Sequence, residues 1–173
     1  MNKVILLLIG LVASVSAAHK LEISAAHFLK AARNNPFSFV KGYLSASHPN
    51  LQGPVTWGTC ASDGGFKVDL TQTHSDPTLP IKGKDVTLDL DGTFTDDAEV
   101  DGVNVFVTWN KTPLYTNDFP RKNPESAGDP YEDKITWNIP SFAPSGHYSV
   151  QVRVHDGETK PKNYGCITAD FDL

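Results

Sequence analysis

Alternation of apolar and polar residues with a period of two constrains this chain more than any other feature of its sequence. In the stretch IPSFAPSGHYSVQVRV, residues 139–154, prolines and a glycine come first, and apolar residues then alternate with polar ones. This pattern predicts a turn followed by a β-strand with one apolar and one solvated face. The apolar residues of the strand are Tyr148, Val150, Val152 and Val154. Such a face can pack into an ordinary core or enclose a carried ligand.

Similar alternation continues along the chain after about Pro54. Short runs rich in β-branched and aromatic residues are separated by Gly, Pro, Asp and Asn. About seven strands of this kind predict an all-β fold, an antiparallel β-sandwich. The predicted strands cover residues 54–60, 65–73, 86–91, 103–108, 134–140, 148–155 and 164–173.

The first 17 residues have the pattern of a secretory signal peptide. Lys3 precedes an apolar run over residues 4–12, and Val15 and Ala17 suit the positions before a cleavage site. A membrane anchor is the alternative interpretation, but the run is too short to span a bilayer. The sequence therefore predicts cleavage after Ala17 or Ala18 and a soluble, secreted mature protein.

Residues 18–53 form a predicted N-terminal extension. Apolar residues at helical spacing predict one amphipathic helix, which the Asn-Asn-Pro stretch at residues 34–36 ends. We interpret the extension as a pro-segment or an amphipathic lid, and the alternative is a loosely attached segment. In each case we expect it to lie outside the sandwich and to be dispensable for folding. The predicted helical stripe consists of Leu21, Ala25, Phe28, Leu29 and Ala32.

Cys60 and Cys166 are the two cysteines of the chain. In a secreted protein they allow one intramolecular disulfide, and two free thiols are the alternative. A zinc site is disfavoured because no histidine stands at ligand spacing from either cysteine. Their separation of 106 positions is too long for the inter-sheet bridge of an immunoglobulin domain, whereas a bridge between the first and last strands fits it.

The distribution of charge argues against two classes of partner. Basic residues outnumber acidic ones in residues 18–50, but the rest of the chain is acidic, and the formal net charge is −5. An acidic domain without a basic patch is not expected to bind nucleic acid or to adsorb strongly to anionic membranes.

The sequence lacks the common catalytic and cofactor motifs. It has no G-x-S-x-G elbow, no H-E-x-x-H and no glycine-rich phosphate loop. None of the six histidines has a second histidine at metal-ligand spacing. We therefore expect no enzymatic activity, no cofactor and no metal. His147 and His155 lie on or beside a solvated strand face, and we expect both at the surface.

The acidic stretch DDAEVDG resembles the first half of a calcium-binding loop through Asp97, Glu99 and Asp101. Thr108 stands where such a loop has its bidentate glutamate, and the intervening residues have the pattern of a strand. A solvated turn between two strands is therefore the better interpretation.

Asn110 begins an N-K-T glycosylation motif, which fits a surface loop of a secreted protein. Pro113 directly after the motif lowers its expected use, so an unmodified Asn110 is the alternative.

Four segments resemble the ML lipid-recognition domain family. VTWGTC resembles the opening strand with its first cysteine, and SDPTLPIKGKDVTLDLDGTF resembles the proline-bearing segment before an alternating strand. IPSFAPSGHYSVQVRVHDG has the family pattern of Pro followed by Pro-x-Gly-x-Tyr, and YGCITADFDL resembles the closing strand. The pattern is most similar to phosphatidylglycerol/phosphatidylinositol transfer-type and Niemann–Pick sterol-carrier-like members.

This resemblance implies an immunoglobulin-like β-sandwich over residues 54–173 that holds a sterol or a phospholipid between its sheets. It implies a Cys60–Cys166 disulfide and a monomeric, secreted or endolysosomal carrier that delivers its lipid to a membrane or a receptor. The Tyr148 hydroxyl is expected near a lipid head group. The residues expected to line the cavity are Val68, Leu70, Leu88, Val105, Val107, Ile135, Trp137, Ile139, Tyr148, Val150 and Val152.

The chain departs from the family at its cysteines, because many members have six and this chain has two. No cluster of Arg or Lys stands at the inward-facing positions, so we expect a head group at the cavity mouth. An extracellular protein-interaction module with a solid core is the alternative function. A small hydrolase is weaker, because no nucleophile–base pair can be named.

Overall fold

The computed structural model describes residues 19–34, 53–157 and 162–173. The predicted signal peptide, residues 1–17, and residues 35–52 of the predicted extension lie outside these ranges. Among the described residues, no helix is long and apolar enough to cross a bilayer.

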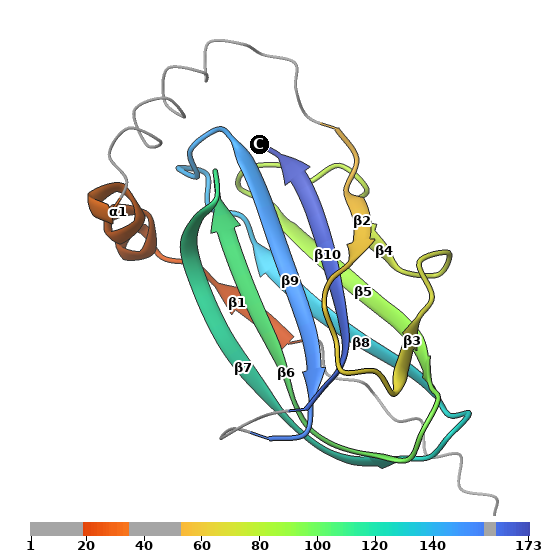
Figure 1. The fold of residues 1–173 in the computed structure, drawn as a ribbon. Coiled ribbons are helices and arrows are strands. Elements are labelled where there is room, and N and C mark those ends of the chain that lie inside the picture. Colours follow the sequence, from red (N-terminus) through yellow and green to blue (C-terminus); the bar gives the residue numbers. More distant parts are fainter. Residues whose placement is uncertain (1–18, 35–52, 158–161) are drawn as a thin grey trace, which may run out of the picture.

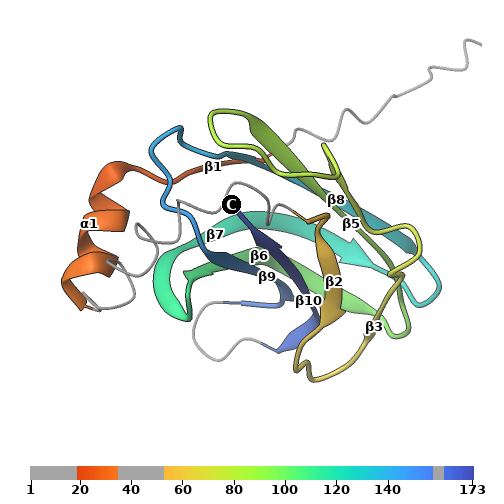
Figure 2. The same ribbon diagram turned by 90° about the horizontal axis from the view of Figure 1, so that it is seen from above.

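Two five-stranded sheets face each other as the layers of a sandwich (Figures 1 and 2). Sheet A consists of β1 (His19–Glu22), β3 (Phe66–Val68), β4 (His74–Asp76), β5 (Asp85–Phe94) and β8 (Pro130–Asn138). Sheet B consists of β2 (Thr56–Thr59), β6 (Ala98–Trp109), β7 (Thr112–Glu125), β9 (His147–His155) and β10 (Asn163–Asp172). The predicted all-β sandwich is confirmed.

The order of strands places the long, strongly alternating strands at the centre of each sheet. Sheet A has the order β1-β8-β5-β3, and β4 also pairs with β5; sheet B has the order β2-β10-β9-β6-β7. Within sheet B, Val152 of β9 lies opposite Val105 of β6 and Ile167 of β10. Directly opposed residues share one face of a sheet, so the period-two pattern of each strand becomes a continuous apolar face.

The sequence pattern did not predict β7, which is 14 residues long. Its segment lacks alternation and contains Pro113, Pro120 and Pro124. In the structure β7 pairs with β6 alone and forms one edge of sheet B. Proline is tolerated in an edge strand because a missing N–H toward the open side breaks no ladder hydrogen bond.

Part of the N-terminal extension belongs to the sandwich. β1 pairs in parallel with β8, and His19 lies opposite Ile135. The helix α1 (Ala25–Asn34) follows and packs beside the sandwich against β7 (Figure 1). A helix outside the sandwich was expected, but the expectation that the whole extension lies apart from the sheets is wrong for β1.

The predicted helical stripe is wrong at three of its five residues. Leu21 belongs to β1 rather than to the helix, Ala25 is exposed, and Leu29 is 67% exposed. The helix buries Phe28, as predicted, and also Ala31. The chain changes from strand to helix between residues 22 and 25, so one helical period could not describe the whole segment.

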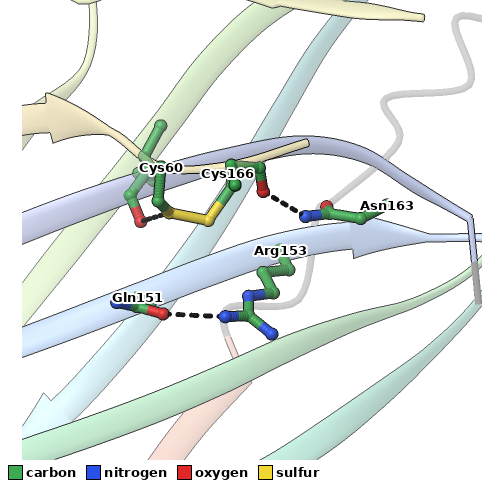
Figure 3. Close-up of a disulfide and its surroundings, with 7 residues drawn as sticks. Cys60, Gln151, Arg153, Asn163 and Cys166 are labelled. Atoms are coloured by element: carbon green, nitrogen blue, oxygen red, sulfur yellow. Dashed lines mark hydrogen bonds between the residues drawn. A yellow bond between two sulfur atoms is a disulfide. The ribbon is translucent and has the colours of Figure 1, made fainter. Parts of the chain in front are cut away.

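The predicted disulfide between Cys60 and Cys166 is present, with the two Cα atoms 5.0 Å apart (Figure 3). Cys60 directly follows β2 and Cys166 lies in β10, so the bridge joins neighbouring strands of one sheet. The Cys60 N–H also donates to the Cys166 carbonyl, at 3.0 Å. Beside the bridge, Asn163 donates a side-chain hydrogen bond to the Ala61 carbonyl at 2.8 Å. Together these contacts hold the short edge strand β2 on sheet B.

The acidic stretch was expected to be a turn, but only Asp96 and Asp97 lie in the turn after β5, because β6 already begins at Ala98. Asp97 lies in the turn and accepts a hydrogen bond from the Ala127 N–H at 3.0 Å. Glu99 and Asp101 belong to β6 and are exposed.

Candidate functional site

The facing surfaces of the two sheets hold most of the residues expected to line a lipid cavity. Nine of these residues are at most 2% exposed, and Val68 is partly buried against the same core. The nine are Leu88, Val105, Val107, Ile135, Trp137, Ile139, Tyr148, Val150 and Val152. Their inward position agrees with the sequence pattern; a role in lipid binding remains a prediction.

Leu70 does not belong to this surface, because it is 41% exposed. β3 ends at Val68, and Asp69 begins a turn in which its carbonyl accepts hydrogen bonds from the Gln72 and Thr73 N–H groups. The side-chain carboxylate of Asp69 also accepts the Thr71 N–H at 2.9 Å. This turn ends the alternation two residues earlier than predicted.

Aromatic side chains hold the sheets in contact at both ends of the sandwich. At one end the ring of Trp137 in sheet A lies 5.7 Å from Tyr148 and 5.6 Å from Phe171, both in sheet B. At the other end Phe94 of sheet A lies 6.0 Å from Tyr164 of sheet B. These centroid distances are those of aromatic rings in contact.

The region between the aromatic ends is lined by shorter aliphatic side chains. From sheet A it receives Leu88, Leu90 and Ile135; from sheet B it receives Val103, Val105, Val107, Val150, Val152, Ile167 and Ala169. All of these residues belong to one apolar cluster.

The aromatic end contains two buried polar groups, the Tyr148 hydroxyl and the Trp137 indole N–H, and only the first has a hydrogen-bond partner among the described residues. The Tyr148 hydroxyl donates to the Pro144 carbonyl at 2.8 Å, and its place near a head group remains a prediction. The indole nitrogen of Trp137 is buried and has no hydrogen-bond partner among the described residues. A buried N–H without an acceptor is uncommon and costs free energy until a partner is supplied.

One ion pair lies between the sheets, and the sequence interpretation did not anticipate it. Arg121 of β7 donates from Nη2 to both carboxylate oxygens of Asp133 in β8, each at 2.7 Å. The two side chains are 12% and 5% exposed. The Tyr131 hydroxyl donates to the same carboxylate at 3.2 Å. Burial and the neighbouring Asp133 raise the pKa of Tyr131, so its hydroxyl keeps the proton that it donates.

The register of β8 offered a signal for this pair. Asp133 stands between Tyr131 and Ile135, at a position where the alternation predicts an inward side chain. A charged residue at an inward position needs a partner. β1 pairs only with residues 135–138 of β8, so Asp133 lies beyond the part of β8 that β1 covers.

The two histidines assigned to the surface have different environments. His147 is exposed, as expected, and lies near Asp170 and Asp172. His155 is only 5% exposed, so its surface assignment is wrong. Its Nε2 lies 2.9 Å from Asp118, while its Nδ1 accepts the Gly157 N–H.

Asn110 lies in the tight turn between β6 and β7, with a φ of 47°. Its side-chain oxygen accepts the His147 N–H at 3.0 Å. Glycosylation of Asn110 remains a prediction.

Three pockets lined by described residues lie on outer surfaces rather than between the sheets. A pocket of about 470 Å³ separates α1 from Phe106 and Leu114, and one of about 320 Å³ lies beside His155. The third, of about 360 Å³, borders Asp91 and Glu132 on sheet A. A ligand between the sheets would therefore occupy space that none of these three pockets provides.

Comparisons with known proteins agree with this architecture. The profile of the ML domain family matches residues 54–173. A Dictyostelium discoideum protein named "Putative phosphatidylglycerol/phosphatidylinositol transfer protein" is 32% identical over 126 residues, which cover 68% of this chain and 85% of that protein.

One solved structure shows a similar kind of fold, and a second match is weaker. The C-terminal domain of wzt superposes with a TM-score of 0.50 at 14% identity, covering 76% of this chain and 83% of that one. A Niemann-Pick type C2 protein from Japanese carpenter ant gives a TM-score of 0.48 at 14% identity, covering 68% of this chain and 98% of that one.

Proposed function

The chain belongs to the ML domain family through residues 54–173, and from this premise we propose that it carries a lipid between sheets A and B without catalysing a reaction. The hydrocarbon of the lipid occupies the aliphatic region between the two aromatic ends. The sheets move apart locally to admit it, because both inner faces are apolar and their contacts there are non-directional.

The unpartnered indole N–H of Trp137 carries this proposal. In a solid core such a donor is a net cost, whereas a lipid ester carbonyl or hydroxyl could accept its hydrogen bond. Trp137 stands at the boundary between the aliphatic region and the aromatic end, so one oxygen of a lipid could reach it while the chains remain apolar. The same donor disfavours a pure hydrocarbon as the ligand.

A phospholipid is favoured over a sterol. The similar Dictyostelium protein is named for phosphatidylglycerol and phosphatidylinositol transfer, and both of those lipids carry a phosphate. Arg121 lies where β7 faces β8. Its Nη2 donates to Asp133 and its Nη1 to the Pro120 carbonyl, and the guanidinium has further N–H donors besides these. A phosphate at this side of the sandwich would gain a charge-assisted hydrogen bond.

The affinity expected from hydrocarbon burial suits a carrier. Burying about 400 Å² of lipid hydrocarbon contributes on the order of 10 kcal/mol at about 25 cal/mol per Å². Immobilising the lipid and parting the sheets offset much of this. The remainder corresponds to roughly micromolar affinity, which holds a lipid in water and still releases it to a bilayer.

The compartment that fits best is extracellular or endolysosomal. The Cys60–Cys166 disulfide suits an oxidising compartment, and the first 17 residues have the pattern of a signal peptide. We propose that the mature protein is a monomer that exchanges its lipid with a membrane or a receptor.

Two measurements test the carrier function. The protein, secreted by a eukaryotic host, is extracted with organic solvent, and the extract is analysed by lipid mass spectrometry. Transfer is then followed between donor and acceptor vesicles that contain labelled phosphatidylglycerol, phosphatidylinositol or cholesterol. We expect roughly one phospholipid per protein and faster transfer of the two phospholipids. If the protein contains no bound lipid and transfers none of the three lipids, the proposal fails, and a protein-interaction module becomes the better hypothesis.

A further inference from the structure

A cluster of three metal-binding side chains lies on the outer face of sheet A, away from the proposed lipid site. It consists of His74 on β4 and Asp89 and Asp91 on β5. His74 lies directly opposite Asp89 in the register of the two strands, and Asp91 follows on the same face. One nitrogen of His74 and one oxygen from each carboxylate lie within 4.8 Å of one another.

The hydrogen bond of His74 leaves the correct nitrogen available. Its Nδ1 lies 2.8 Å from the Gln72 carbonyl oxygen, which can only accept, so Nδ1 carries the proton. The lone pair of the neutral ring is then on Nε2, which lies 3.8 Å from the Asp89 carboxylate. A histidine that donates one ring N–H to a carbonyl and presents the other nitrogen has the arrangement common among metal ligands.

Asp89 supplies a second, independent indication of a bound cation. It is 6% exposed, and its Oδ1 is buried without a hydrogen-bond partner in the described part of the chain. Its Oδ2 is bound by Lys134 at 3.0 Å. A buried carboxylate oxygen without a donor is costly. The Asp89 oxygen 3.8 Å from His74 Nε2 is Oδ2, so a cation would satisfy Oδ1 by binding the carboxylate through both oxygens.

Negative charge is crowded around the cluster. Glu132 of β8 lies directly opposite Asp91 in the register of sheet A, and Asp89 lies two residues away on the same face of β5. Lys134 offsets part of this charge by contacting both Asp89 and Glu132. A divalent cation beside Asp89 and Asp91 would relieve the remaining repulsion.

We propose that His74 Nε2 and the carboxylates of Asp89 and Asp91 bind a divalent zinc ion on the outer face of sheet A. Imidazole and carboxylate together suit zinc, whereas calcium and magnesium prefer oxygen ligands alone. Three protein ligands leave a fourth position for water.

The ligand atoms must move closer to hold a zinc ion. Ligand atoms about 2.0 Å from a tetrahedral zinc lie about 3.3 Å from one another, whereas His74 and Asp89 are 3.8 Å apart and the three atoms lie within 4.8 Å. The His74 side chain is 62% exposed and can rotate to close this gap. Among the described residues, Lys134 is the cation that contacts Asp89 and would oppose the metal, so its removal offers a sensitive test.

Zinc binding is measured by isothermal titration calorimetry of the full mature chain, free of affinity tags and stripped with a chelator. The variants are His74→Gln, Asp91→Asn and Lys134→Met. His147→Gln is the matched control, because His147 is also an exposed histidine near two carboxylates. Thermal unfolding without metal verifies that each variant is folded.

We expect His74→Gln and Asp91→Asn each to weaken the tightest zinc site at least tenfold, and Lys134→Met to strengthen it. His147→Gln should leave the affinity of that site unchanged. The proposal is overturned if the wild type takes up no zinc at about 1 mM, which corresponds to negligible affinity. It is equally overturned if His74→Gln binds as tightly as the wild type.

Discussion

Arg121 and Asp133 join the two sheets through a buried ion pair, in which one guanidinium nitrogen lies 2.7 Å from each carboxylate oxygen. Arg121 comes from the edge strand of sheet B, and Asp133 comes from the part of β8 in sheet A that β1 does not cover. The pair closes a side of the sandwich where the inner faces would otherwise end in apolar side chains. Removal of one member should therefore lower the free energy of unfolding more than removal of both.

Replacing Arg121 with methionine should destabilise the protein strongly. The change leaves the Asp133 carboxylate buried, with only the Tyr131 hydroxyl as a donor. Removal of one partner of a buried pair typically costs about 3 to 5 kcal/mol. Urea unfolding followed by tryptophan fluorescence measures the loss.

The double variant Arg121→Met/Asp133→Leu should recover most of that stability, because no charge remains buried. Arg153→Gln is the control, since Arg153 is exposed and bonds only Gln151 among the contacts that the structure gives it. Its free energy of unfolding should change by less than about 0.5 kcal/mol. A double variant as unstable as Arg121→Met would mean that the cost comes from lost packing.

The inner faces could be predicted from the sequence because sheet geometry repeats every two residues. Val150 and Val152 follow this rule, and so does every other buried strand residue in the predicted lining. Leu70 did not, because alternation alone does not mark the end of a strand; Asp69, a common turn residue, was the available signal.

The polar contacts of the site were harder to predict. Arg121 and Asp133 belong to different sheets, and no local pattern states which inward charge meets which partner. His155 is buried because the backbone of Gly102 leaves room for its ring, whose atoms lie 2.8 Å from where a Cβ would be. Such complementarity between distant residues depends on the packed fold and has no periodic signature.

Removal of the described N-terminal segment should weaken the sandwich. A chain beginning at Gly53 lacks β1, which covers residues 135–138 of β8, and it lacks Phe28 and Ala31, which are buried. Losing one buried phenylalanine alone costs about 3 kcal/mol or more. We expect a lower melting temperature by circular dichroism and a stronger tendency to associate through the exposed β8 edge.

A chain beginning at His19 is the control for this deletion, because it keeps every described residue. It should have the same melting temperature as the protein left after the predicted signal-peptide cleavage. Equal melting temperatures for the chains beginning at His19 and Gly53 would show that residues 19–52 contribute nothing to stability.

Trp137→Phe should mainly weaken lipid binding, whereas Trp109→Phe should mainly lower the stability of the fold. Both tryptophans are at most 1% exposed, but only the indole N–H of Trp109 has a protein acceptor, the Ser145 carbonyl at 3.3 Å. Trp109→Phe should therefore lower the free energy of unfolding more, by about 1 kcal/mol for the lost hydrogen bond. Trp137→Phe should weaken phospholipid binding by a similar amount, roughly fivefold, in a vesicle-competition assay. Equal lipid affinities in the two variants would contradict the proposed hydrogen bond between Trp137 and the lipid.

Val150→Phe tests whether the aliphatic region holds a ligand. Val150 is 1% exposed and lies opposite Val107 on one side and Ala169 on the other. If the sheets part there to hold hydrocarbon, the larger ring occupies that space while remaining apolar. Lipid transfer should then fall at least tenfold, while the melting temperature stays the same or rises.

In a solid core, the same ring would overpack the region and cost about 1 to 3 kcal/mol. The matched variant is Val150→Ile, which adds one methylene and should change transfer far less. Transfer between vesicles and thermal unfolding are measured on the same preparations, because the two interpretations differ in their combination. If Val150→Phe loses lipid transfer but keeps its melting temperature, the lipid lies between the sheets. If it loses stability while its folded fraction transfers lipid as before, the lipid binds elsewhere.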